Sequence, residues 1–230
     1  MRSAPILLSS LLLSAAARAG GFEAEAAGVM ASFREAKAAL RSGASPAMVL
    51  GDLQASRELK EQALSDLRAH GIFDDDAARA LLDLLEREKD PSLRAQAARV
   101  FYLLFYDVRG AEEAVSSFLL RAETVSRVER HLTEDPQPEV RREMAQLGQI
   151  MLNGFQAGQR EPLAEAYLPL LVKGLADPDP DQRNEVLVAL EAFRLTAAFR
   201  RPESRTAIAA ARDREPDPDL KERVAGLLSP

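Results

Sequence analysis

Apolar residues recur along most of the chain with the spacing of a helix. Four stripes place an apolar side chain every three or four residues, and no long stretch alternates apolar and polar positions as a strand would. Such spacing puts the apolar side chains on one face of each helix and predicts that this face is buried. The stripes are Leu93-Ala97-Val100-Leu104, Val140-Met144-Leu147-Met151, Val186-Ala189-Phe193 and Leu220-Val224-Leu227. The pattern predicts an all-α fold.

Each stripe begins at a short recurring pattern in which proline is followed three residues later by arginine or lysine. The copies begin at Pro91, Pro138, Pro180 and Pro218, and a fainter copy without proline begins at Arg57. Proline suits the first position of a helix because its missing N–H would have no partner there. The residue before each start is an aspartate or serine that can cap the helix, except for Gln137. Five helix starts are therefore predicted.

Further helices fit between these starts, which lie about 40 residues apart. The segment 111–131 is expected to break near Ala122, and Pro169 is expected to kink the segment 162–175. A short helix is expected from Ser45 and Pro46, and an amphipathic helix over 22–41. The remaining predicted helices lie at 74–85 and 203–212. The chain thus reads as helix pairs that repeat.

A unit of two helices that recurs with Asp-Pro-x-[Val/Leu]-Arg starts resembles the HEAT-repeat family of α-solenoids over roughly residues 44–228. The resemblance implies that the proline-led helix is the second of each pair and lines the concave side. It also implies a ladder of Asp and Arg between neighbouring repeats, with Asp90 and Arg94, Asp179 and Arg183, and Asp217 and Lys221 at the matching positions. Gln137 departs from that pattern. A compact helical bundle is the competing architecture.

The N-terminus has the features of a secretory signal peptide. Arg2 precedes an apolar run over 6–17 that is shorter than the ~20 residues needed to span a bilayer, and Ala17-Arg18-Ala19 provides a cleavage site. We expect cleavage after Ala19, a capping segment over 20–43 and a repeat domain over 44–230. The fold expected is an α-solenoid of about five HEAT-like helix pairs after a cleaved signal peptide. A buried first helix is the alternative.

Charge and composition exclude several classes of function. The chain of 230 residues has a net charge of −6, which becomes −8 when Arg2 and Arg18 are removed, and an acidic surface disfavours nucleic acid. Absence of Cys removes thiolate chemistry, and two His cannot build a three-His metal centre. His70 and His131 are interpreted as surface residues at helix ends. No later segment is apolar enough to span a membrane, so the mature chain is expected to have no stable membrane span.

Acidic turns leave one metal hypothesis open. Carboxylates alternate with other residues over 177–181 and again over 213–219. Such spacing can gather oxygen ligands around Ca²⁺, yet the glycine and glutamate that an EF-hand loop requires are replaced by Gln182 and Val188. Turns and helix caps explain the same residues. We therefore expect no cofactor and no metal.

The aromatic segment 101–106 is the best candidate for recognition, because one helix cannot bury all of its rings against two neighbours. Tyrosine suits positions that are apolar on one side and wet on the other. We expect Tyr102 and Tyr106 on the concave surface with Arg99 beside them. The next proline-led helix would add Arg142, Gln146 and Gln149. The competing interpretation is that both tyrosines only cover the edge of the core.

These features predict a non-enzymatic scaffold or adaptor, periplasmic or secreted, that binds another protein. A solenoid exposes a long surface on a rigid backbone, which suits this role. An accessory subunit of an envelope assembly and, less favoured, a metal-dependent enzyme remain alternatives.

Overall fold

The computed structural model describes residues 45–70, 73–152 and 155–229. The predicted signal peptide (1–19) and capping segment (20–43) lie outside these residues. The described chain contains helices and connecting turns only, as the sequence predicts. The helices are α2 (Pro46–Gly51), α3 (Arg57–His70), α4 (Asp75–Arg87), α5 (Pro91–Leu103), α6 (Glu112–Leu119), α7 (Ala122–Thr133), α8 (Pro138–Ile150), α9 (Ala157–Gly174), α10 (Pro180–Phe193), α11 (Ala197–Arg200), α12 (Pro202–Arg214) and α13 (Pro218–Leu228).

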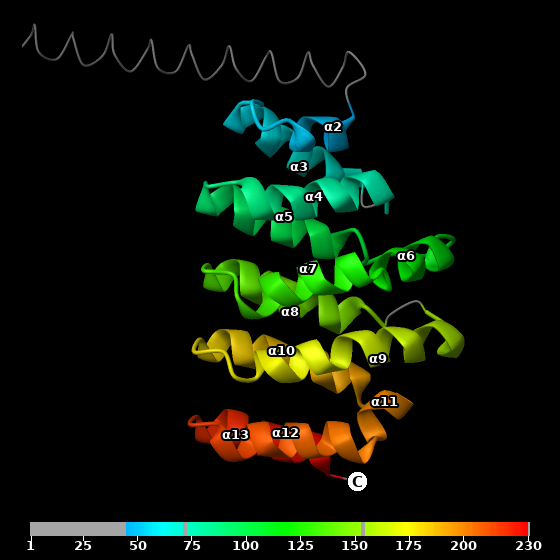
Figure 1. The fold of residues 1–230 in the computed structure, drawn as a ribbon, viewed down its shortest axis with the longest axis vertical. Coiled ribbons are helices and arrows are strands. Elements are labelled where there is room, and N and C mark those ends of the chain that lie inside the picture. Colours follow the sequence, from blue (N-terminus) through cyan, green and yellow to red (C-terminus); the bar gives the residue numbers. More distant parts are fainter. Residues whose placement is uncertain (1–44, 71–72, 153–154, 230) are drawn as a thin grey trace, which may run out of the picture.

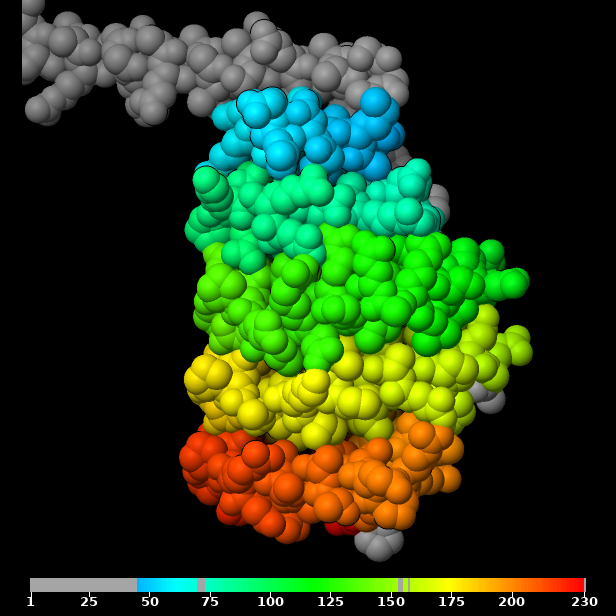
Figure 2. All heavy atoms as spheres, viewed as in Figure 1, coloured from blue at the N-terminus to red at the C-terminus, as the bar shows by residue number. Residues whose placement is uncertain are grey.

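The helices form five pairs stacked in chain order along the long axis of the molecule (Figure 1). The pairs are α2–α3, α4–α5, α7–α8, α9–α10 and α12–α13, with the short α6 and α11 preceding α7 and α12. Helices α3, α5, α8, α10 and α13 pack on one another in succession, while α4, α7, α9 and α12 form the second layer. Figure 2 shows the sequence colours as successive bands, so segments distant in sequence do not mix. This is the arrangement of a solenoid.

The helix starts and the core follow the pattern of the sequence. Asp90, Asp179 and Asp217 accept hydrogen bonds from free backbone N–H groups of the first turn. Gln137 makes no such side-chain bond. All residues of the four apolar stripes are buried, which confirms that these faces form one continuous core. The break predicted near Ala122 is present between α6 and α7.

Helix α9 begins earlier than expected. The sequence predicts a helix from Pro162, whereas α9 starts at Ala157 and contains both Pro162 and Pro169. The Gln156 N–H donates to Oε1 of Gln159 at 3.3 Å. A side-chain amide thus assists a start that lacks the Ser, Thr, Asp or Asn usually seen before a helix.

Ion pairs that are largely buried connect the second helix of each of the first four pairs to the turn that precedes the second helix of the next pair. Lys60 Nζ lies 2.8 Å from Oε2 of Glu88, and Arg94 pairs with Asp135. The two later pairs are bidentate. Arg141 donates to Asp177 at 2.6 and 3.0 Å, and Arg183 donates to Glu215 at 2.9 Å twice.

This ion-pair ladder corrects the pairing that the family resemblance implies. Asp90, Asp179 and Asp217 cap their helices, and the ladder acid is instead the residue three positions before each proline. Each ladder acid also accepts the N–H of the residue two positions on, at 2.9–3.0 Å. The backbone bond holds the carboxylate where the arginine of the preceding repeat reaches it. Gln137 does not interrupt the ladder, because Asp135 carries it.

His131 is buried, contrary to the expectation of a surface residue. Its side chain lies in the last turn of α7, and Nδ1 is 2.9 Å from Oδ2 of Asp135. The last turn of α7 faces the ladder, so the ring packs inside the array. His70 is the last residue of α3, as expected.

Candidate interaction surface

The proline-led helices α5, α8 and α10 bring seven side chains together, which we call the polar row. Helix α5 contributes Arg99 and Tyr102, helix α8 contributes Arg142, Glu143, Gln146 and Gln149, and helix α10 contributes Glu185. Spacings of three, four and seven residues place the α8 members on one helix face. Because α5 and α10 both pack on α8, the three helices present their members side by side.

Tyr102 lies at the edge of the core. Its ring is half-buried and packs against the hydrophobic cluster. Burial raises the pKa of the phenol, and the charge of Glu143 adds to the rise, while Arg99 lowers it through its charge and a hydrogen bond. Tyr102 therefore combines an apolar body packed on the core with a phenol that interacts with Arg99 of the same helix.

Tyr106 lies outside the row. Helix α5 ends at Leu103, and Tyr106 follows in the turn with 70% of its surface exposed. The expected tyrosine pair on one helix face is therefore not formed. Phe101 and Phe105 are fully buried, with ring centroids 5.1 Å apart, so the core takes up the two phenylalanines.

Arg142 is held loosely. Its guanidinium lies 3.4 Å from carboxylate oxygens of Glu139, Asp179 and Asp181. These distances exceed those of a good charge-assisted hydrogen bond. The Nε atom is buried and lies 3.4 Å from Oδ2 of Asp179, but makes no hydrogen bond within the described chain. Arg142 thus retains capacity to bind another group.

Glu143 was not singled out by the sequence, and the pKa of its carboxyl is perturbed. Burial raises the pKa of its carboxyl, the charge of Glu185 adds to the rise, and Arg99 and Arg142 oppose it. Its Oε2 atom is buried without a hydrogen-bond partner among the described residues. Glu185 itself accepts a bond of 2.6 Å from Nε2 of Gln149. The signal that could have found Glu143 is its spacing of three residues from Gln146.

Gln146 is half-buried and makes no hydrogen bond within the described ranges. The row as a whole therefore carries two arginines, two carboxylates, two amides and a phenol. Mixed charge with unused donors and acceptors suits a polar protein surface.

The acidic turns are occupied by interactions of the fold. Asp177 pairs with Arg141, and Asp179 accepts the N–H of Asp181. Glu215 and Asp217 repeat these roles in the last pair. In the described part of the chain, no three His, Asp or Glu side chains are grouped to hold a metal ion. None of the helices there is long and apolar enough to cross a membrane.

Comparisons with known proteins bear on the fold. No protein-family model matches the chain, and no curated protein matches it in sequence. Among solved structures, it is similar to the crystal structure of an engineered protein from the Northeast Structural Genomics Consortium. The TM-score is 0.51 at 19% sequence identity, over 85% of this chain and 82% of that chain. The likeness supports an all-α fold of stacked helices.

Proposed function

We propose that this protein is an exported, non-enzymatic α-solenoid of the HEAT type that binds another protein through the polar row. Buried polar groups in folded proteins are nearly always hydrogen-bonded. Glu143 Oε2 makes no hydrogen bond within the described chain, and the guanidinium of Arg142 makes only contacts of 3.4 Å with carboxylates there; both residues lie in the row. Groups of a partner that donate to Glu143 and accept from Arg142 would complete these bonds. These two incompletely bonded groups carry the proposal.

Export rests on the sequence of residues 1–19, which lie outside the described structure. A solenoid that folds through aliphatic packing and an ion-pair ladder needs no disulfide, and the chain has no Cys. Such a protein can fold in an oxidising compartment without thiol chemistry.

The test compares partner capture by two double variants of the tagged full-length chain. Tyr102→Ala with Arg142→Ala removes the apolar edge and the loose cation of the row. We expect this variant to lose a partner that the parent chain captures from the envelope fraction after cross-linking. The control is Leu195→Ala with Arg200→Ala, which removes an exposed apolar residue and an arginine away from the row. Mass spectrometry quantifies the captured protein in both.

Equal capture of the partner protein by the two variants would show that the polar row is not the binding surface. Circular dichroism and melting temperature must match the parent, because loss of folding would also abolish capture. A separate Tyr106→Ala variant reports whether the exposed turn after α5 contributes. Fixed stoichiometry with one assembly would indicate an accessory subunit, the alternative kept from the sequence.

A further inference from the structure

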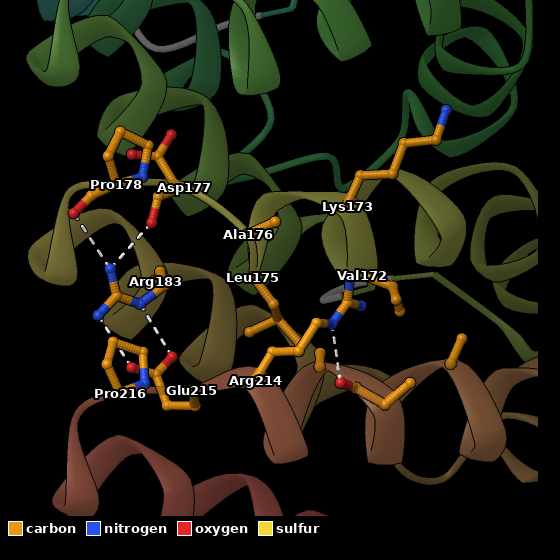
Figure 3. Close-up of a pocket in the computed structure, with 13 residues that line it drawn as sticks. Val172, Lys173, Leu175, Ala176, Asp177, Pro178, Arg183, Arg214, Glu215 and Pro216 are labelled. Carbon is orange, nitrogen blue, oxygen red and sulfur yellow. Dashed lines mark hydrogen bonds and ion pairs between the residues drawn. The ribbon is translucent and has the colours of Figure 1, made fainter.

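A cavity of about 730 Å³ opens between α9 and α12, on the second layer of the array (Figure 3). One wall is the C-terminal part of α9 with Val172 and Leu175, and the other is α12 with Ala207, Ala210 and Ala211. The cavity is open to solvent along one side. Its volume falls within the roughly 300–1,000 Å³ typical of ligand pockets.

The cavity exists because α12 departs from the repeat. Counted back from the ladder acid of each pair, Ala207, Ala210 and Ala211 of α12 occupy the positions of Arg127, Arg130 and His131 of α7. The arginines of α7 fill the space toward α4 and pair there with Asp83 and Glu86. The alanine side chains of α12 are too short to reach α9 in the same way. The last interface therefore lacks both the side chains and the ion pairs that close the earlier one.

The acids that line the cavity are already neutralised. Asp177 is bound by Arg141, and Glu215 is bound by Arg183. Lys173 extends away from α12 (Figure 3) and pairs with Glu129 of α7. The remaining charge in the cavity is that of Arg214.

Arg214 reaches from the end of α12 across the cavity toward α9 (Figure 3). Its Nε donates to the carbonyl of Ala210 at 3.0 Å, and no carboxylate of the described residues pairs with it. The cavity thus combines apolar walls with one cation that has no carboxylate partner among the described residues, in a protein whose net charge is −6. Its charge complements an anionic, apolar ligand.

We propose that this cavity binds a short peptide segment of a partner protein, with an apolar side chain between α9 and α12 and a carboxylate on Arg214. The open side favours a peptide over a fatty acid, because a peptide backbone can remain in water while one side chain is buried. The cavity lies on the second layer and does not involve the polar row, so the two proposals stand independently.

The probe is a random decapeptide library displayed on phage and selected against the full chain. We expect enrichment of peptides that place a large apolar residue within a few positions of Asp or Glu. A synthetic copy of the leading peptide is then titrated by fluorescence anisotropy. Ala210→Phe fills the cavity from an exposed position and should weaken binding at least about tenfold. Arg214→Glu should weaken it about fivefold at low salt.

Matched controls are Ala192→Phe and Arg200→Glu, both at exposed positions away from the cavity. They should bind the peptide as the parent does. Ala207→Leu serves as a second filling variant if Ala210→Phe proves unstable. Enrichment of basic peptides, or of peptides with no shared pattern, would overturn the proposal. Unchanged binding of an enriched peptide by both filling variants would also overturn it. If a dansyl-labelled fatty acid binds in the cavity and no peptide is enriched, the assignment to a peptide is overturned.

Discussion

Glu143 shows how one residue can be held in an unfavourable state by its neighbours. The carboxyl is half-buried, its Oε2 is unpartnered, and burial raises its pKa. Its ionised form is therefore less stable in the folded chain than in the unfolded chain. Groups perturbed in this way are frequent at binding and catalytic sites, which supports the assignment of the polar row.

Replacing Glu143 by Gln should stabilise the protein at neutral pH. A raised folded-state pKa means that the cost appears as pH rises above the unfolded value of about 4.3. Glu143→Gln should thus melt at a higher temperature than the parent at pH 7.5, and the difference should shrink toward pH 4. Differential scanning fluorimetry across this range measures it. A variant that is less stable than the parent at pH 7.5 would contradict the account.

At the scale of elements, α8 and α10 pack closely because one position has no side chain. A Cβ added at Gly148 would lie 2.8 Å from Cβ of Ala189, an atom fixed to the α10 backbone. Gly174 plays a similar part toward Val186, with a Cβ contact of 2.9 Å. Gly148 therefore sets the distance between two neighbouring pairs, and Gly174 sets the distance between the two helices of the α9–α10 pair.

Gly148→Ala should destabilise the protein by about 1–2 kcal/mol. Overpacking costs about 1–3 kcal/mol, and the gain in helix propensity recovers up to about 1 kcal/mol. Gly226→Ala is the matched control, since Gly226 lies within α13 and an added Cβ would meet no atom within 4 Å. Urea unfolding should show that Gly148→Ala lowers the free energy of unfolding and that Gly226→Ala raises it. Equal stabilisation of both would show that α8 and α10 separate without cost.

At the scale of the molecule, the ion-pair ladder joins the five pairs in one direction. A base on the second helix of one pair binds an acid held by the backbone just before the second helix of the next pair. Burial opposes ionisation of Asp135, but its bonds to His131 and the Gln137 N–H and the charge of Arg94 lower its pKa overall. The hydrogen bond from Lys60 lowers the pKa of Glu88. The ladder therefore depends on ionised carboxylates.

Acid should weaken the array through these carboxylates. A lowered folded-state pKa contributes stability that is present above the unfolded value of about 4 and is lost as pH falls through the folded value. Asp135→Asn should cost about 3–5 kcal/mol at pH 7, because it leaves Arg94 buried without its partner. Urea titrations from pH 7 to 3 should show the difference from the parent shrinking. A difference that does not change with pH would contradict this role of the ladder.

The predictability of the site differs between its members. Five members of the row lie on neighbouring helices as the helical spacing suggests, because consecutive pairs stack in sequence order. They are Arg99, Tyr102, Arg142, Gln146 and Gln149. Tyr106 was misplaced because the end of α5 carries no glycine or proline signal before it. The spacing from Gln146 could have placed Glu143 in the row, but not its raised pKa, which depends on burial and on Arg99 and Glu185 from neighbouring pairs.

The sequence by itself determined the helices, their buried faces and the five-pair order. These properties depend on residues within a turn or two of one another: caps, prolines and apolar spacing. Tertiary structure alone decided which acid joins the ladder, that His131 is buried, and that a cavity opens beside α12. The ladder joins side chains 28 to 41 residues apart, and the burial of His131 and the cavity depend on how neighbouring pairs pack, which helical periodicity does not encode.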